Sequence, residues 1–259
     1  MKEVRIEYPF LFFFRKTQTI QVPEEWIDLT GPQFALCCKT YMEPVTDIQF
    51  ISGFFGIKKS LSKRLDKFYQ YKLIELAGFI AGPKATVNFF YLQEIPGTGL
   101  TAPGKRLHGV TFERFILFDT LFFDYINDRK ENVLANFIAI LYLKNNETLN
   151  EIDIDERVNF IVKKVDKCTQ YAIFLNYTFI RKWLSKPYPW LFGFKEDDPD
   201  EPAKRSIHPK KPNRPDWNAV LEGLVGDDII HYENYKQIPC IVAFRTINRR
   251  IQIYNKYGK

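Results

Sequence analysis

The residues most often used for metal binding and nucleophilic catalysis are few in this sequence of 259 residues, which has three histidines and four cysteines. No histidine lies at a metal-ligand spacing from another histidine or a cysteine, and no two cysteines form a Cys-x-x-Cys pair. We therefore expect neither a metal site nor a cofactor. The cysteines are interpreted as small core residues of a protein in a reducing compartment; they are Cys37, Cys38, Cys168 and Cys240.

Two short patterns carry residue types found in catalytic motifs. Residues 97–99 read Gly-Thr-Gly, but no Gly-Lys-Ser/Thr follows and the next helix is predicted only from Thr111, which argues against a phosphate-binding loop. Residues 226–228 read Gly-Asp-Asp and precede His231, yet this phrase is typical of a turn between helices whose aspartate caps the second one. Both patterns are therefore interpreted as loops or turns.

Acidic residues gather at Asp153, Asp155 and Glu156, at the predicted start of a helix, where the helix dipole stabilises negative charge without any acid–base role. No serine, histidine and aspartate stand in a nucleophile-elbow context. The sequence thus carries no local sign of catalysis, and we expect a protein that is not an enzyme.

The net charge of +6, from 37 basic and 31 acidic residues, is spread along the chain. Dedicated nucleic-acid domains gather basic residues on one face, so a mixed solvated surface is the favoured interpretation. A nucleic-acid-binding protein stays open as an alternative, and its contact residues would be Lys210, Lys211, Arg245, Arg249 and Arg250. The start of the chain lacks the apolar region of a signal peptide, and no window of eighteen residues is free of polar interruption, so we expect no membrane span.

The elements that must position any site begin with an N-terminal β-hairpin. Residues 4–8 alternate between apolar and polar, and residues 10–14 and 17–22 read as strands about a polar turn at residues 15–16. Thr30 and Gln33 then form a capping-box pattern that opens a helix reaching residue 42. Further helices are predicted over residues 46–56 and 60–80.

A similar order of elements follows. Residues 86–92 read as a strand and residues 95–104 as a loop or irregular hairpin tip, before Thr111 opens an aromatic-rich helix to residue 127 and another helix spans 131–143. This order of strands, capped helix and helix repeats that of residues 4–56 and suggests an internally duplicated hairpin and helix–helix unit. The longest helix is predicted over 155–185, ended by two prolines at 187 and 189.

The last part of the chain changes composition. Residues 195–215 carry acidic, then basic residues with five prolines, which predicts an exposed linker. Residues 216–259 follow as helices, the last over 240–254 with one apolar and one basic face; a packed terminal helix is favoured over a membrane-surface role. The predicted fold is mainly α-helical α+β with small antiparallel β elements, divided into residues 1–83, 84–194, 195–215 and 216–259.

Aromatic residues make up 16% of the chain, which has 24 phenylalanines and 14 tyrosines. Aromatic side chains are enriched at the centres of protein interfaces, so this excess favours a role in binding another protein, with ordinary core packing as the alternative for each residue. The candidate contact residues are Trp26, Phe34, Phe122, Phe123, Trp183, Tyr188, Trp190 and Trp217.

Several phrases resemble those of proteins encoded near the tape-measure gene in tailed phages and prophages of the Bacteroidetes type. The N-terminal phrase runs from Val22 through Pro23, Trp26 and Leu29 to Thr30-x-x-Gln33-Phe34. The others are residues 50–57, Thr111-x-x-Arg114-Phe115 before residues 134–142, Tyr188-Pro189-Trp190-Leu191-Phe192, and Gly226-Asp227-Asp228 with Tyr235 and Pro239 before a terminal amphipathic helix. The phrases span nearly the whole chain, and each is short.

This resemblance implies a tail-assembly chaperone that binds the apolar helices of a tape-measure protein, in the cytoplasm of the bacterial host. An aromatic-rich helical surface can cover an apolar helix by helix-in-groove contact. The size of the chain and its mixed-charge linker would also suit a subunit built into the virion, such as a neck, connector or baseplate component, which stays open as an alternative. A homo-oligomer is compatible with either role.

Overall fold

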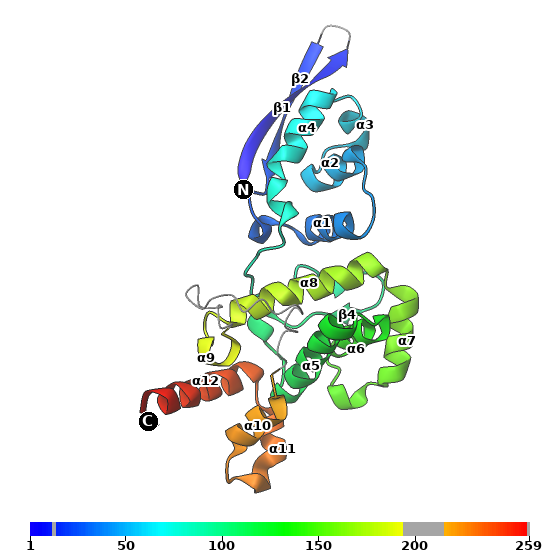
Figure 1. Ribbon diagram of the computed structural model, residues 1–259. Coiled ribbons are helices and arrows are strands. Elements are labelled where there is room, and N and C mark those ends of the chain that lie inside the picture. The colour runs from blue at the N-terminus through cyan, green and yellow to red at the C-terminus, as the bar shows by residue number, and fades with distance from the viewer. Residues whose placement is uncertain (12–13, 194–214, 258–259) are drawn as a thin grey trace, which may run out of the picture. The chain divides into compact units, whose positions relative to one another are not determined.

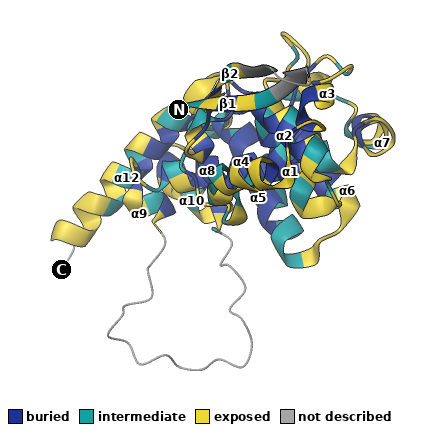
Figure 2. Cartoon of the chain, turned by 90° about the horizontal axis from the view of Figure 1, so that it is seen from above, coloured by how far each residue is buried: buried dark blue, intermediate teal, exposed yellow. Residues whose placement is uncertain are grey.

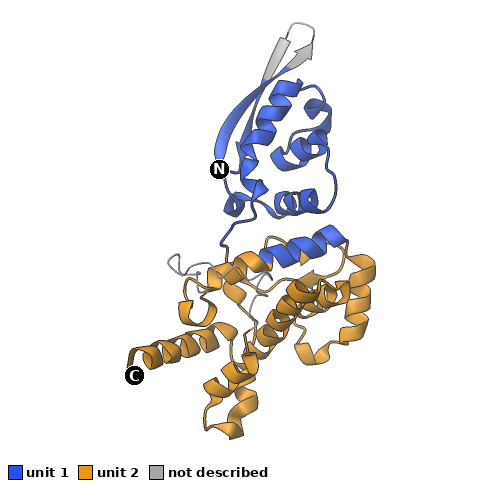
Figure 3. Ribbon diagram, viewed as in Figure 1, with its two compact units in different colours: residues 1–86, 167–176 blue, residues 87–166, 177–259 orange. Residues whose placement is uncertain are grey.

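The computed structural model describes residues 1–11, 14–193 and 215–257. Over this part the chain is mainly helical, with two small antiparallel sheets of two strands each, which confirms the predicted fold class (Figure 1). It divides into two compact units, shown in Figure 3. Unit 1 holds residues 1–86 and 167–176, and unit 2 holds residues 87–166 and 177–259.

Unit 1 begins with a hairpin of β1 (Lys2–Leu11) and β2 (Phe14–Val22), whose antiparallel register pairs Lys2 with Val22. The polar turn predicted at residues 15–16 is wrong, because Arg15 and Lys16 lie inside β2 and pair with β1. The register shifts between Pro9 and Leu11 and ends with the pair Leu11 and Phe14, so β2 begins before the predicted turn.

The first helix of unit 1 begins with the predicted capping box, and the second begins with another one. Thr30 and Thr46 each accept a hydrogen bond from the backbone N–H three residues later, and Gln33 and Gln49 complete both capping boxes. The elements are η1 (Trp26–Asp28), α1 (Gly31–Met42), α2 (Asp47–Phe55), α3 (Lys59–Ser62), α4 (Lys67–Leu76) and η2 (Gly78–Ala81).

The single helix predicted over residues 60–80 is wrong, because the chain breaks between α3 and α4. Asp66 caps α4 by accepting from the backbone N–H of Tyr69 at 2.9 Å. The buried Gln70 amide donates to the carbonyl oxygens of Ser62 and Leu65, at 3.1 and 2.9 Å. These bonds satisfy backbone groups that the break leaves without helical partners. The side chains of Asp66 and Gln70, both inside the range predicted as one helix, therefore stabilise the break.

Unit 2 contains a minimal hairpin, β3 (Glu94–Ile95) with β4 (Leu100–Thr101), and a set of packed helices. The strand predicted over residues 86–92 is wrong: those residues precede β3 without strand pairing. The other elements are η3 (Lys105–Leu107), α5 (Phe112–Asp128), α6 (Glu131–Leu141), η4 (Leu149–Glu151), α7 (Ile154–Lys164), α9 (Pro189–Phe192), α10 (Trp217–Val225), η5 (Ile229–His231), α11 (Tyr232–Gln237) and α12 (Cys240–Tyr257).

The long helix predicted over residues 155–185 is two helices, α7 and α8 (Lys167–Leu184). Val165 ends α7 with extended backbone, at φ −99° and ψ 119°, and its side chain is buried. Burial of this apolar residue in the break explains why the hydrophobic pattern continues across it. The prolines act as predicted, since α8 ends at Leu184 and Pro189 occupies the first turn of α9.

The cysteines lie where small core residues are expected. All four are free thiols, and Cys37, Cys38 and Cys240 are buried while Cys168 is half-buried. Burial raises the pKa of the Cys37 and Cys240 thiols to about 12 each. A thiol with so high a pKa is a poor nucleophile at neutral pH.

Candidate partner-binding surface

A buried charged cluster in unit 2 holds the C-terminal helices to the rest of their unit. The Asp119 carboxylate on α5 is fully buried and accepts hydrogen bonds from the Tyr177 hydroxyl at 2.6 Å and from the Trp217 indole N–H at 2.8 Å. Arg181 donates to the same carboxylate through Nε at 2.6 Å and Nη2 at 3.3 Å. One carboxylate thus joins α5, α8 and the first residue of α10.

Aromatic rings enclose the cation of this cluster. The Arg181 guanidinium lies 4.3 Å from the centroid of the Phe123 ring, with Phe122 and Phe192 at 5.9 and 5.6 Å. Burial raises the pKa of Tyr177 well above its ordinary value, and the Asp119 charge adds to the rise, so Tyr177 stays a neutral donor. Every oxygen of the carboxylate has donors from the chain itself, and we assign the cluster to structure.

Six of the eight aromatic residues predicted as partner contacts lie in the core of the folded chain. Their exposed fractions are at most 8%, and a buried ring offers no area to a partner, so we assign these six to packing. Phe34 packs edge-on against Trp26 in unit 1, and in unit 2 Phe115 packs edge-on against Trp217. The six are Trp26, Phe34, Phe122, Phe123, Tyr188 and Trp217.

The other two predicted aromatics reach the surface of unit 2. Trp183 on α8 is half-buried, and Trp190 on α9 is 50% exposed. The backbone N–H groups of Trp190 and Leu191 donate to the Asn248 side-chain oxygen of α12, at 2.9 and 3.2 Å. Asn248 therefore caps α9 and fixes the backbone of Trp190 beside α12.

The apolar stripe of α12 changes from buried to exposed along the helix. Phe244 and Ile247 are buried in unit 2, whereas Ile251 is half-buried and Tyr254 is 72% exposed. Their separations of three, four and three residues keep all four on one face of a helix. Figures 1 and 2 show α12 running outward to the described C-terminal end, with exposed residues over its last turns. The apolar stripe of α12 thus extends past the elements of unit 2 that cover its first half.

Basic residues occupy the opposite side of α12. Arg245 and Arg249 are exposed, and no acidic residue occurs between Cys240 and Tyr257. Arg250 has a structural role, since its Nη1 donates to the carbonyl oxygens of Gly223 and Leu224 at the end of α10, at 2.7 and 2.8 Å. The other predicted nucleic-acid contacts, Lys210 and Lys211, lie outside the described residues.

The predicted Gly-Asp-Asp turn at residues 226–228 lies on the surface of unit 2. Gly226 ends α10 with φ 60°, as the turn prediction expected, but the predicted aspartate cap is wrong: Asp228 precedes η5 without a capping hydrogen bond, and its carboxylate bonds the His231 ring at 2.7 Å and the Tyr235 hydroxyl at 3.1 Å. The bond from His231, followed by that from Tyr235, lowers the pKa of Asp228.

Across the described ranges, no three His, Cys, Asp or Glu side chains gather as a metal site, and no helix is long and apolar enough to cross a bilayer.

The exposed half of α12, with Trp190 beside it, is the part of unit 2 best suited to contact a partner; we call residues Trp190, Ile251 and Tyr254 the α12 seam. The sequence pattern indicated the apolar face of this helix, but not where its burial stops, which depends on α9 and α10. Comparison of the chain with protein-family models, curated proteins and solved structures found no match.

Proposed function

We propose that this chain is a non-catalytic assembly protein of a tailed phage or prophage, which binds apolar α-helices of a tape-measure protein. The observation that supports binding is the α12 seam, where the apolar stripe of α12 is no longer covered as it is at Phe244 and Ile247: Ile251 is half-buried and Tyr254 is exposed. The phage context rests on the resemblance of the sequence phrases.

A helical partner fits this surface for two physical reasons. Residues spaced by three and four positions present one apolar stripe, which packs against the corresponding stripe of another helix. Tyr254 and Trp190 supply large, stiff contact areas, and their polar atoms can remain in water at the edge of the contact. The cationic back of α12 favours a partner with acidic residues flanking its apolar stripe.

The test is co-purification of the tagged full chain with helical segments of the tape-measure protein encoded in the same genome. The double variant Ile251→Asp, Tyr254→Asp should lose the segment, because two carboxylates in the seam would be desolvated in the contact. Val162→Asp on α7 is the matched control, since Val162 is an exposed apolar helix residue, 45% accessible, away from the seam. This control should co-purify like the unchanged chain.

Equal retention by the unchanged chain and the seam variant would overturn the proposed surface. A complex with a second copy of this chain that depends on the same two residues would overturn the proposed partner. Mass spectrometry of purified particles separates the two assembly roles, because a chaperone leaves the particle and a neck, connector or baseplate subunit remains in it. Binding to DNA that weakens steeply with added salt and requires Arg245 and Arg249 would favour the nucleic-acid alternative.

A further inference from the structure

The loop before α5 has an unusual backbone. Arg106 and Leu107 adopt left-handed conformations, with φ of 59° and 58°, and Gly109 follows at φ 81°. Two consecutive non-glycine residues in this region are unfavourable, because the Cβ atom approaches the backbone oxygen. Such conformations persist where surrounding bonds over-determine them, and they cluster at binding sites.

Those surrounding bonds are present on both sides of the loop. Gly104 and His108 exchange two backbone hydrogen bonds, at 3.1 and 3.2 Å, and the backbone N–H of Arg106 donates to the carbonyl oxygen of Asn88 at 2.6 Å. At the end of the loop the backbone N–H of Cys240 donates to the carbonyl oxygen of Val110 at 2.9 Å. The loop is therefore fixed against the start of α12, although the two segments lie far apart in sequence.

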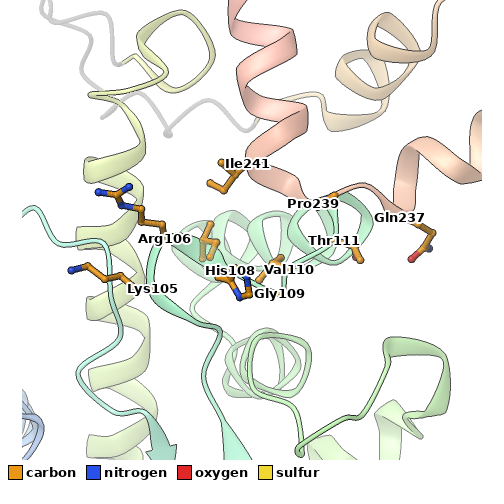
Figure 4. A pocket seen from close by; sticks show the side chains of 10 residues that line it. Lys105, Arg106, His108, Gly109, Val110, Thr111, Gln237, Pro239 and Ile241 are labelled. Atoms are coloured by element: carbon orange, nitrogen blue, oxygen red, sulfur yellow. The ribbon is translucent and has the colours of Figure 1, made fainter.

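A cavity of about 470 Å³ lies between this loop and residues 237–241 (Figure 4). This volume falls within the range of about 300 to 1,000 Å³ that is usual for small-ligand sites. The side chains of Leu107 and Val110 form a buried floor, and Pro239 and Ile241 line the facing side from α12 and the residue before it. The interior of the cavity is thus suited to an aliphatic group.

The rim of the cavity is positively charged. Lys105, Arg106 and His108 are among the ten lining residues, none of which is acidic. All three are exposed, and in the described part of the chain none of them forms a salt bridge. Figure 4 shows the Lys105 and Arg106 side chains extending to the same side of the loop, away from Gln237.

Burial raises the pKa of the Tyr188 hydroxyl, and the positive charges of Arg245 and Arg106 oppose that rise. An apolar cavity with unpaired cations at its mouth complements a molecule with an aliphatic body and an anionic head.

We propose that this cavity binds an aliphatic carboxylate, with the alkyl group against Leu107, Val110 and Ile241 and the carboxylate at Arg106. A guanidinium binds a carboxylate through two parallel hydrogen bonds, and Lys105 adds a second positive charge on the same rim. The left-handed loop is the element that presents Arg106 at the mouth while Leu107 points into the floor.

The test is isothermal titration of sodium octanoate into the full chain, with octan-1-ol as the uncharged counterpart. Octanoate should bind saturably at one site and at least about tenfold more tightly than the alcohol, because a charge-assisted hydrogen bond discriminates by roughly this factor. Absence of saturable octanoate binding, or equal binding of acid and alcohol, would overturn the proposal.

Variants locate the site. Arg106→Asn removes the cation while keeping a residue that tolerates left-handed backbone, and should weaken octanoate binding about tenfold; Arg106→Lys should retain most of it. Ile241→Asp should abolish binding by placing a like charge in the apolar wall. Lys163→Asn on α7 is the charge-matched control, and it should bind octanoate like the unchanged chain.

Circular dichroism establishes that each variant is folded; if Arg106→Asn is not, Lys105→Gln serves in its place and should weaken binding by a smaller factor. Unchanged octanoate affinity in both rim variants and in Ile241→Asp would overturn the proposed site. A short peptide ending in leucine, with a free or an amidated C-terminus, identifies the source of the carboxylate. Tighter binding of the free peptide than of octanoate indicates a polypeptide C-terminus, and the reverse order indicates a free aliphatic acid.

Discussion

Replacing Asp119 by asparagine removes the negative charge of the buried cluster at almost constant volume. Asp119 accepts four hydrogen bonds, two at Oδ1 from Tyr177 and Arg181 and two at Oδ2 from Trp217 and Arg181. An amide group presents N–H where one of these oxygens stood, so two of the donors lose their acceptor. Arg181, which is 8% exposed as a residue, is then left as a buried cation without its counter-charge.

The expected loss follows from these two effects. Breaking a buried ion pair by removing one partner destabilises a protein by about 3–5 kcal/mol, and the lost hydrogen bonds are part of that figure. Domains are stable by about 5–15 kcal/mol, so Asp119→Asn should remove a large share of the stability of unit 2. Trp217→Phe deletes a single donor to the carboxylate and should cost about 1–2 kcal/mol.

Urea unfolding followed by tryptophan fluorescence measures both losses. Three of the four tryptophans, Trp183, Trp190 and Trp217, lie in unit 2, so the signal reports mainly on that unit. Asp227→Asn is the matched control, because the same chemical change is made at an exposed residue. A change of less than about 1 kcal/mol for Asp119→Asn, with an unchanged urea slope, would refute the assignment of Asp119 as the anchor of α10.

Three further predictions concern other contacts. Thr30→Ala removes one side of the α1 capping box and should lower the free energy of unfolding of unit 1 by about 1 kcal/mol, measured by amide hydrogen exchange. Arg114→Met leaves the carbonyl oxygens of Ile140 and Leu141 without their donors, at 2.9 and 2.8 Å, and should destabilise unit 2 by about 2 kcal/mol in urea unfolding. Burial raises the pKa of the Glu147 carboxyl, but the hydrogen bond from Arg157, the backbone bond at Lys144 and both charges lower it overall below its ordinary 4.5. This carboxylate therefore stabilises the fold above pH 4.5 and loses that effect as the pH falls, so thermal melts of Glu147→Gln should show a shallower acid-induced loss of stability.

Local signals in the sequence predict helix starts better than helix ends. Thr30 and Thr111 cap the helices that their patterns predicted, and Thr46 and Asp216, the first residues of predicted helical ranges, also cap helices, because a capping hydrogen bond depends on residues within one turn. The breaks at residues 63–66 and 165–166 were missed, since an apolar pattern continues through them. The first break is stabilised by hydrogen bonds from the Gln70 side chain to the carbonyl oxygens of Ser62 and Leu65. The spacing of apolar residues carries no information about such side-chain bonds.

The candidate surfaces were harder to predict than the fold. The sequence marked Ile251 and Tyr254 as part of an apolar face, but their exposure depends on how far α9 and α10 extend along α12. The Asp119 cluster joins residues 58, 62 and 98 positions apart, so no local pattern reveals it. For the cationic cavity, the only sign of an unusual loop in the sequence is the pair of glycines at 104 and 109. The residues that adopt left-handed backbone there are Arg106 and Leu107, whose types do not indicate that conformation.

The motif Thr-x-x-polar-Phe occurs in both units, and in each its polar residue binds carbonyl oxygens at the end of the next helix. In unit 1 the Gln33 amide donates to the carbonyl oxygen of Phe54, near the end of α2, at 2.7 Å. In unit 2 Arg114 donates to the last carbonyl oxygens of α6.

In each case the threonine caps its own helix, the third residue after it caps the end of the next helix, and the following phenylalanine is fully buried. The two hairpins differ greatly in length, so the shared feature is this two-helix unit. Internal duplication therefore stays a hypothesis, and the helix pairs α1 with α2 and α5 with α6 provide its physical basis: one short motif caps the start of the first helix and binds the last carbonyl oxygens of the second.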